Sequence, residues 1–171
     1  NIWEVVGMGT EKYVQDKGEN LYRRTVYNFW KRMAAPANLD IFNAPSREMS
    51  CIRRDRTNTP LQALVAMNDP QFVEAARNLA QKVFLAGPTE DARLQAASER
   101  VLGRPLRGEE LAVLRRALGE FRAHYAARTA EAEALLKVGE SRPQAELPAA
   151  ELAAWTMVCN QLLNLDETIT K

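Results

Sequence analysis

The chain has 171 residues, 46% of them hydrophobic, and its 23 Lys and Arg nearly balance 22 Asp and Glu, leaving a formal net charge of +1. This length is enough for one domain that buries roughly two thirds of its unfolded surface without a disulfide or metal staple. A charge so close to zero creates no overall field that would attract nucleic acid or an anionic membrane. No apolar run approaches the ~20 residues that span a bilayer. We therefore expect a water-soluble protein with no nucleic-acid partner and no membrane span.

The chain opens on Asn-Ile-Trp-Glu, which carries no initiator methionine, basic leader or apolar signal core. We expect a C-terminal fragment of a larger multidomain protein, organised as a single helical domain over residues 1–171. Residues 1–19 contain three glycines and only short apolar runs, so we expect irregular chain there that could belong to an upstream unit.

Apolar residues with helical spacing begin after Asn20. They recur at intervals of three and four, as Tyr22, Val26, Phe29 and Met33, and predict a first helix that ends at Pro36. This pattern favours core packing over the alternative that the basic side chains and aromatic rings of residues 22–32 bind single-stranded nucleic acid. Residues 36–58 lose the pattern and predict a long loop, of the kind that usually has a functional or docking role.

Two dipeptides mark the next helix starts, Thr59-Pro60 and Asp69-Pro70. In each, the polar side chain can accept a hydrogen bond from the first turn, and proline occupies a position whose N–H would have no partner in the helix. We predict a brief helix over residues 60–67 and a core helix that begins at Pro70 and ends at Gly87.

Three further helices are expected before residue 164. Thr89 and Gly103 mark the ends of the first, and a seam of large apolar residues over 111–125 predicts the second, which can continue toward Gly139. Residues 139–148 are typical of a linker. The last helix begins at Pro148, and its predicted buried stripe is Leu152, Trp155, Cys159 and Leu162. The predicted fold is all-α: an irregular N-terminal segment and an arginine-rich loop packed on an orthogonal or bundle-like set of about five to six helices.

Few residues could carry chemistry by themselves. His124 is the only histidine and lies off the apolar seam, so we expect it to face solvent. With Cys51 and Cys159 far apart in the sequence, the chain has no metal-ligand spacing, haem-attachment motif or hydrolytic triad. We predict no catalytic residue, metal or cofactor in this segment. Burial is expected for Cys159, and for Cys51 it is favoured over activation of the thiolate by the arginines that follow.

The most distinctive segment is residues 47–60, where four arginines and two acids precede a helix start. Guanidinium groups bind carboxylate, sulfate or phosphate with paired hydrogen bonds, and the N–H groups of a helix start add partial positive charge. The alternative, which we favour slightly, is an internal ion-pair network that holds the loop onto the body. The candidate residues for binding an anion or a neighbouring domain are Arg47, Glu48, Arg53, Arg54, Arg56 and Asn58.

Several longer motifs resemble a known family. They are Leu-Tyr-Arg-Arg-Thr-Val-Tyr-Asn-Phe-Trp-Lys-Arg at 21–32, Ala-Pro-Ser-Arg-Glu at 44–48, Thr-Asn-Thr-Pro-Leu-Gln-Ala-Leu at 57–64 and Asn-Asp-Pro-Gln-Phe-Val-Glu-Ala-Ala at 68–76. The ending, residues 155–171, is also similar. The chain thus resembles the C-terminal domain of unknown function, numbered fifteen fifty-three, of planctomycete-type cytochrome-c proteins.

The resemblance implies an extracytoplasmic setting, periplasmic or secreted, and an upstream domain that carries haem c, but it supplies no catalytic residues. The leading hypothesis is a noncatalytic module that docks on upstream domains of the same protein, partly through residues 47–58. One alternative is a substrate-facing part of an enzyme that acts on anionic, for example sulfated, carbohydrate through its arginine loop. Another is an electron-transfer docking module whose basic residues steer a cytochrome partner.

Overall fold

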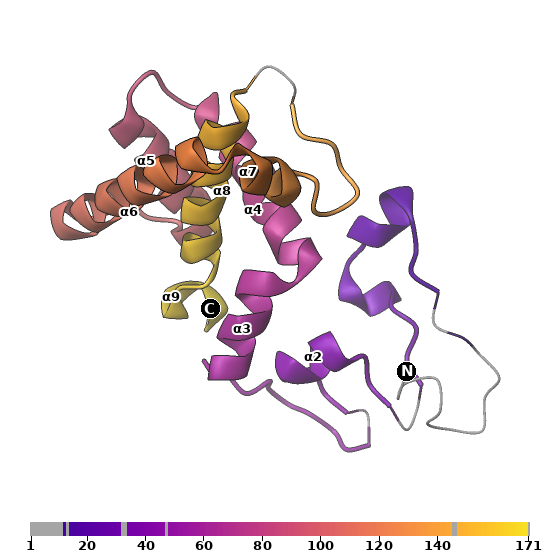
Figure 1. Cartoon of the computed structure of the whole chain (residues 1–171). Helices are drawn as coiled ribbons and strands as arrows, with labels where there is room; N and C mark the ends of the chain where they lie inside the picture. The colour runs from indigo at the N-terminus through magenta and orange to yellow at the C-terminus, as the bar shows by residue number, and fades with distance from the viewer. Residues whose placement is uncertain (1–11, 13, 32–33, 47, 145–146, 171) are drawn as a thin grey trace. The chain divides into compact units, whose positions relative to one another are not determined.

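The structure is a computed structural model of the chain, and it describes residues 12, 14–31, 34–46, 48–144 and 147–170. The chain divides into two compact units, Asn1–Thr57 and Asn58–Lys171. All regular secondary structure assigned in the described residues is helical, as predicted (Figure 1). The one exception there is an isolated β-bridge between Lys31 and Ala34. The organisation of residues 1–171 as one domain stays a prediction.

The described part of the first unit contains only short helical turns. Two 3-10 helices, η1 at Gly18–Tyr22 and η2 at Thr25–Tyr27, are followed by the five-residue helix α2 at Ala37–Ile41. None of the three contains a buried residue. The described residues of this unit therefore hold no helix that could form a core.

The helix predicted between Asn20 and Pro36 is wrong for its described part, residues 21–31 and 34–35. Thr25, Val26 and Tyr27 are β-branched or aromatic, and such side chains lose rotamer freedom in a helix. A helix of this length is stable mainly when its apolar face packs on another element, yet Val26 and Phe29 are 67% and 59% exposed. The apolar side chains recur with helical spacing, but they stay exposed, so packing does not stabilise a helix here.

The second unit is built from longer helices. Their bounds are α3 Pro60–Asn68, α4 Pro70–Phe84, α5 Glu90–Leu102, α6 Gly108–Ala127, α7 Thr129–Leu136, α8 Ala149–Leu163 and α9 Asp166–Ile169. Six of these helices have eight residues or more, so the predicted all-α architecture with five to six helices is confirmed. The continuous helix allowed by the apolar seam is instead broken at Arg128, whose φ of −136° and ψ of 62° separate α6 from α7.

The predicted helix starts are confirmed by their caps. The side chain of Thr59 accepts a hydrogen bond from Gln62 N at 3.2 Å, and the Gln62 side chain in turn accepts one from Thr59 N at 2.9 Å. The side chains of Asp69 and Thr89 cap α4 and α5 by accepting hydrogen bonds from Gln71 N and Ala92 N. At the other end of α5, Gly103 adopts a left-handed φ of 73°, as a glycine stop requires. These local signals explain why the helix starts could be predicted well.

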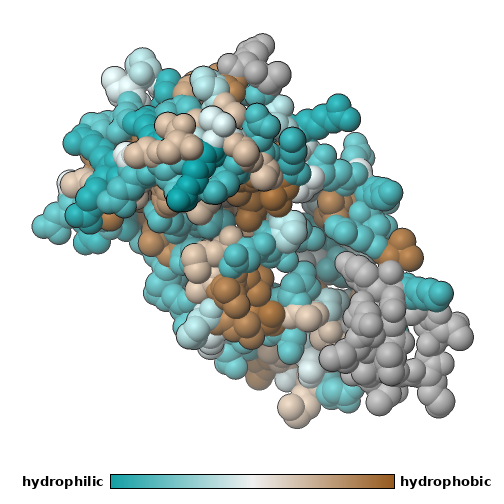
Figure 2. Space-filling model, viewed as in Figure 1, coloured by the Kyte–Doolittle hydropathy of each residue, from teal (hydrophilic) through white to brown (hydrophobic). Residues whose placement is uncertain are grey.

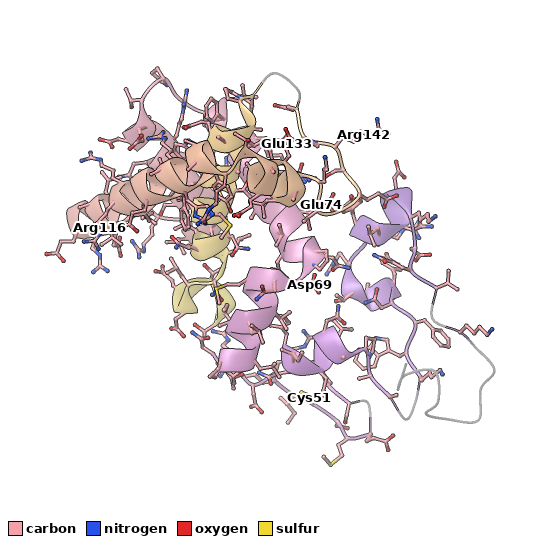
Figure 3. All side chains as sticks on the ribbon, viewed as in Figure 1. Cys51, Asp69, Glu74, Arg116, Glu133 and Arg142 are labelled. Atoms are coloured by element: carbon pink, nitrogen blue, oxygen red, sulfur yellow. The ribbon has the colours of Figure 1, made fainter. Side chains whose placement is uncertain are left out.

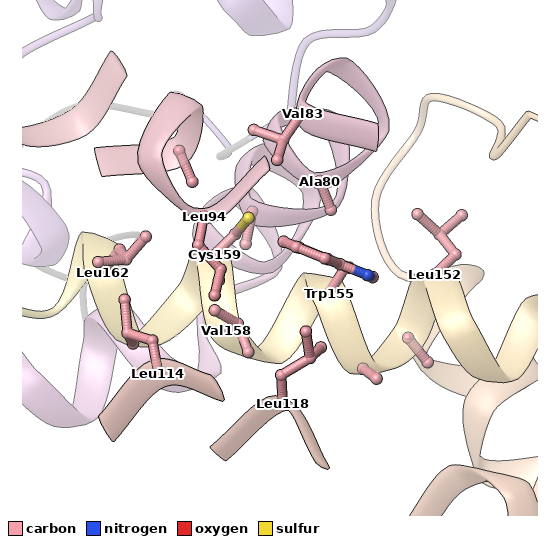
Figure 4. Packing of buried hydrophobic residues seen from close by; sticks show 14 of the residues in the cluster. Ala80, Val83, Leu94, Leu114, Leu118, Leu152, Trp155, Val158, Cys159 and Leu162 are labelled. Carbon is pink, nitrogen blue, oxygen red and sulfur yellow. The ribbon is translucent and has the colours of Figure 1, made fainter. Parts of the chain in front are cut away.

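Helix α8 forms the centre of the second unit. It packs chiefly on α4 and α6, and also on α7 (Figure 1). The four predicted stripe residues are all buried, and the neighbouring positions Ala153, Ala154, Thr156, Val158 and Asn160 are buried as well. A helix that is buried almost all round is a core helix rather than an amphipathic surface helix. Figure 4 shows its residues Trp155 and Cys159 among apolar side chains of the surrounding helices.

Charged side chains join the helices at the edge of this core. Arg122 of α6 donates to Glu151 of α8 at 2.8 Å and to Glu90 of α5 at 2.5 Å, while the indole N–H of Trp155 donates to Glu151 at 2.8 Å. Burial alone raises the pKa of the Glu151 carboxyl, but the hydrogen bonds from Arg122 and Trp155 outweigh burial, so its pKa is lowered. Three helices are therefore linked through one guanidinium group.

Candidate functional site

The arginine loop, which we define as residues 48–57, lies in the first unit. Glu48, Arg53, Arg54 and Arg56 are all exposed there, whereas Arg47 lies outside the described residues. Asn58, the last of the predicted site residues, is the first residue of the second unit, where its side-chain amide donates to Asp166 at 3.0 Å. The structure therefore places four of the six predicted residues in one loop and gives Asn58 a role at the start of α3.

An asparagine, rather than an ion pair, holds this loop. The side-chain amide of Asn43 donates to the carbonyl of Asp55 at 3.2 Å and to the hydroxyl of Thr57 at 2.7 Å. Asn43 itself has a left-handed φ of 56°, a conformation that asparagine tolerates better than most residues. Within the described residues, Arg53, Arg54 and Arg56 form no ion pair, so the internal network that we considered is not seen there. Their guanidinium groups are therefore exposed without an ion pair to any described residue.

Helix α3 exposes a row of large apolar side chains on one side, which we call the α3 face. Its residues Leu61, Leu64 and Met67 are 52%, 55% and 46% exposed. Figure 2 shows hydrophobic surface gathered over α3. The opposite side of α3 is fixed to the core, because Gln62 and Ala66 are buried there and the Ala66 carbonyl accepts a hydrogen bond from Asn160 at 3.1 Å. An uncharged, apolar face on a fixed helix is suited to binding another apolar surface.

A second polar cluster was missed in the sequence. We call it the polar clamp: Glu74, Arg77, Asn78 and Gln81, which follow one another along α4 (Figure 3, where Glu74 is labelled). Arg77 donates to the carbonyls of Leu136, Val138 and Ser141, the last at 2.6 Å. The carboxylate of Glu74 accepts from the N–H groups of Glu140 and Ser141, and Gln81 accepts from Gln144 N at 2.7 Å.

The polar clamp shows that the described part of residues 139–148 is a bound segment rather than the linker we expected. Gly139 has a φ of 90°, and a Cβ atom at this position would overlap the Glu74 side chain. Glu74 and Arg77 are 4% and 1% exposed. Their spacing on the inward side of α4, beside Val73 and Ala76, was the available signal. These hydrogen bonds to main-chain atoms of residues 136–144 fix that segment to α4.

The residues that the structure describes contain no group of three or more His, Cys, Asp or Glu residues that could hold a metal ion. None of their helices is long and apolar enough to cross a bilayer. The arginine loop and the α3 face are candidate binding surfaces within the described residues.

Comparison with protein families gives a match over residues 4–118 to PSD1, described as a protein of unknown function (DUF1553). This match covers more than half of the chain. The chain belongs to the PSD1 family. No curated protein and no solved structure matches it. The family predicted from the motifs is thus confirmed, while the resemblance of residues 155–171 to the family's ending stays a prediction. The PSD1 match ends within α6, so the central helix α8 lies beyond the matched residues.

The two cysteines of this PSD1 chain have opposite environments. Cys159 is fully buried in α8, as predicted, and burial raises the pKa of its thiol to about 12. Cys51 is exposed in the arginine loop, so the burial that we favoured is wrong. Its thiol donates to the Arg53 carbonyl at 3.2 Å. The apolar neighbours Met49 and Ile52 are exposed as well, so this loop does not pack into a core, a property that residue type alone does not reveal.

We expect the two thiols to differ sharply in reactivity. In the native chain at mildly alkaline pH, a disulfide reagent such as DTNB should modify Cys51 quickly and leave Cys159 intact, since the reactive species is the thiolate and access is required. Denaturation in guanidinium chloride should release the second thiol. The variant Cys51→Ser should show no fast thiol, and two fast thiols in the native chain would contradict the structure.

His124 is 39% exposed, in agreement with its predicted place beside solvent. One ring nitrogen lies 3.1 Å from Glu131 and the other 3.0 Å from Arg128, so both are engaged at the junction of α6 and α7. Its neighbour Tyr125 is buried, which raises the pKa of that phenol, with a smaller contribution from Glu131. No nucleophile is paired with the imidazole among these contacts, so the cluster fits a helix junction.

Proposed function

We propose that this PSD1 chain is a noncatalytic docking module that packs on upstream domains of the same protein. The observation that supports this proposal is the α3 face, where three large apolar side chains about half exposed lie side by side on a helix whose other side is fixed. Helix α3, from Pro60 to Asn68, contains no charged residue. Burial of such a face lowers the free energy, because apolar surface leaves water and no charged group has to be desolvated.

The size of the α3 face favours a partner in the same polypeptide. Full burial of one Leu or Met contributes roughly 1.5–3 kcal/mol, so burying the exposed half of three side chains contributes roughly 2–4 kcal/mol. A stable complex between separate proteins usually buries about 800 Å² on each partner, far more than three half-exposed side chains offer. A covalently linked domain binds at high effective concentration, and a smaller contact is then sufficient.

The docking module would work outside the cytoplasm, beside a haem domain. We propose an extracytoplasmic location and an upstream domain that carries haem c, on the resemblance of the motifs to planctomycete-type cytochrome-c proteins. In that arrangement this chain would contribute a helical surface and no redox chemistry of its own. Fractionation of cells that make the protein would test the location directly, because a cytoplasmic signal would contradict it.

Covalent footprinting tests the docking surface. The full natural protein and this chain alone would be labelled with a carbene reagent, and the labelling of Leu61, Leu64 and Met67 compared by mass spectrometry. We expect these three residues to lose most of their labelling in the full protein. Leu85, which follows the end of α4, and Val113 of α6 are 74% and 53% exposed and serve as internal controls. Equal labelling of the α3 face in both samples would contradict the proposal.

A matched pair of substitutions tests the energy of docking. We expect Leu64→Ser to weaken binding to the upstream part of the protein, produced as a separate polypeptide, by about tenfold, equivalent to ~1.4 kcal/mol. Val113→Ser is the control, since Val113 is a helix residue of nearly the same exposure, 53% against 55%. Calorimetric titration would measure both. An equal effect of the two substitutions would show that the α3 face is not the contact surface.

The arginine loop supports a second candidate: the substrate-facing part of an enzyme that acts on anionic carbohydrate. The specific observation in its favour is the exposure of Arg53, Arg54 and Arg56 without an ion pair in the described residues. The double substitution Arg53→Ala, Arg54→Ala should then weaken binding of a sulfated oligosaccharide. The third alternative, electron-transfer docking, stays a prediction that a salt-independent association rate would refute.

A further inference from the structure

Three aromatic side chains lie exposed on the first unit, and two of them, Tyr22 and Phe29, were expected in a core. Tyr22, Tyr27 and Phe29 are 57%, 70% and 59% exposed. With Arg23 and Arg24, they lie within eight consecutive positions of the sequence, 22–29, and we call these five residues the aromatic–arginine turn. Exposed aromatic rings next to arginines present flat faces and guanidinium groups that can stack on a ligand.

The main chain of this turn is held by its own hydrogen bonds. Tyr27 N donates to the Arg24 carbonyl at 3.0 Å, and Asn28 N donates to the Thr25 carbonyl at 3.1 Å. The guanidinium carbon of Arg23 lies 5.9 Å from the centroid of the Tyr27 ring, within range of a cation–π contact. The ring and the guanidinium group therefore form a joint platform, and the high exposure of Tyr27 leaves ring surface available to a ligand.

The charge of the turn is unbalanced. Residues 20–39 contain no Asp or Glu, and residues 1–57 as a whole have ten Lys and Arg against seven Asp and Glu. Neither Arg23 nor Arg24 forms an ion pair with any residue that the structure describes. A partner that complements this surface carries negative charge together with a flat apolar face.

We propose that the aromatic–arginine turn binds an anionic polysaccharide. A sugar ring presents its C–H groups as a flat apolar face that can lie on Tyr27, while its sulfate or carboxylate group accepts paired hydrogen bonds from Arg23 or Arg24. This surface lies outside the arginine loop. The proposal does not depend on docking through the α3 face, and it adds a second surface to the carbohydrate candidate.

The charge density of the ligand favours polysaccharide over single-stranded nucleic acid. Nucleic acid carries a phosphate on every nucleotide, and its binding relies on many basic contacts and on domains that are strongly basic overall. The chain has a net charge of only +1, and two arginines serve the turn. A sugar polymer with an anionic group on every second ring or so matches two guanidinium groups beside a stacking platform.

Titration of the whole chain with defined oligosaccharides tests the proposal. The probes are oligosaccharides of a sulfated galactan, the same oligosaccharides after desulfation, and oligothymidine. We expect binding to the sulfated probe, loss of binding after desulfation, and weaker binding to oligothymidine. Tyr27→Ala should weaken binding of the sulfated probe by about tenfold, as removal of one stacking ring does elsewhere, while Tyr27→Phe should retain it.

Two controls keep the outcomes separate. Arg100→Ala removes an exposed arginine of α5 in the second unit and should leave binding unchanged. The Arg53→Ala, Arg54→Ala double variant distinguishes the arginine loop from the turn: a loss confined to this variant would assign binding to the loop and overturn the proposal. Undiminished binding by Tyr27→Ala, tighter binding of oligothymidine, or no binding of the sulfated probe would each overturn it too. Circular dichroism of Tyr27→Ala should match that of the unmodified chain, because the ring is exposed.

Discussion

Replacing Arg77 with alanine should lower the free energy of unfolding of the second unit by about 3–5 kcal/mol. Arg77 is 1% exposed and donates to three main-chain carbonyls as well as to the Ser141 hydroxyl at 2.7 Å. Its removal takes the guanidinium group away from the buried Glu74 carboxylate, 3.6 Å distant, and from the C-terminal end of α7. A buried group that loses its partner costs far more than an exposed one.

Urea unfolding followed by circular dichroism measures this effect. Arg100→Ala is the matched control, since Arg100 is an exposed arginine on the neighbouring helix α5, and its substitution should change stability by less than about 0.5 kcal/mol. The double variant Glu74→Leu, Arg77→Met removes both charges together, and we expect it to be more stable than Arg77→Ala alone. A loss below about 1 kcal/mol for Arg77→Ala would show that the polar clamp contributes little.

The second large effect is expected from Trp155→Ala, which should cost about 3–5 kcal/mol. Trp155 is fully buried at the centre of α8, and its ring lies edge-on to Phe84 with centroids 6.3 Å apart. Alanine would leave a large cavity between α8 and α4 and would remove the indole N–H that donates to Glu151. Both the lost contacts and the lost hydrogen bond act in the same direction.

Thermal and urea unfolding of Trp155→Ala and Trp155→Phe separate these contributions. Phenylalanine fills most of the cavity but cannot donate a hydrogen bond, so its cost should be clearly smaller than that of alanine. Tyr27→Ala is the aromatic control, because Tyr27 is 70% exposed and its loss should barely change stability. Equal costs for Trp155→Ala and Tyr27→Ala would refute the central place of α8.

Local signals predicted the second unit well because its helices begin and end at residues with strong preferences of their own. Thr59, Asp69 and Thr89 cap helices, Gly103 ends one, and each acts within a few residues of itself. The same short range explains the predicted stripe on α8. Burial of its remaining sides depends on how many helices surround it, and spacing within one helix does not contain that information.

The failures have a common physical origin in contacts between distant residues. The helical spacing of Tyr22, Val26 and Phe29 predicted a packed helix. The three side chains are instead more than half exposed in the described chain. Glu74 and Arg77 drew no prediction from the sequence, because they bind main-chain atoms more than sixty residues away. The arginine loop was recognised by its charge alone. Its exposure became apparent only from the structure.

The position of α8 in the order of the chain has a consequence for synthesis on the ribosome. Helices α4 to α7 are translated first, and the sides that pack on α8 have no cover until residues 149–163 leave the exit tunnel. Translation at about 5–20 residues per second leaves those sides open for seconds, long enough to attract chaperones or to aggregate. The nascent chain closes its core late, in one step, when the central helix arrives.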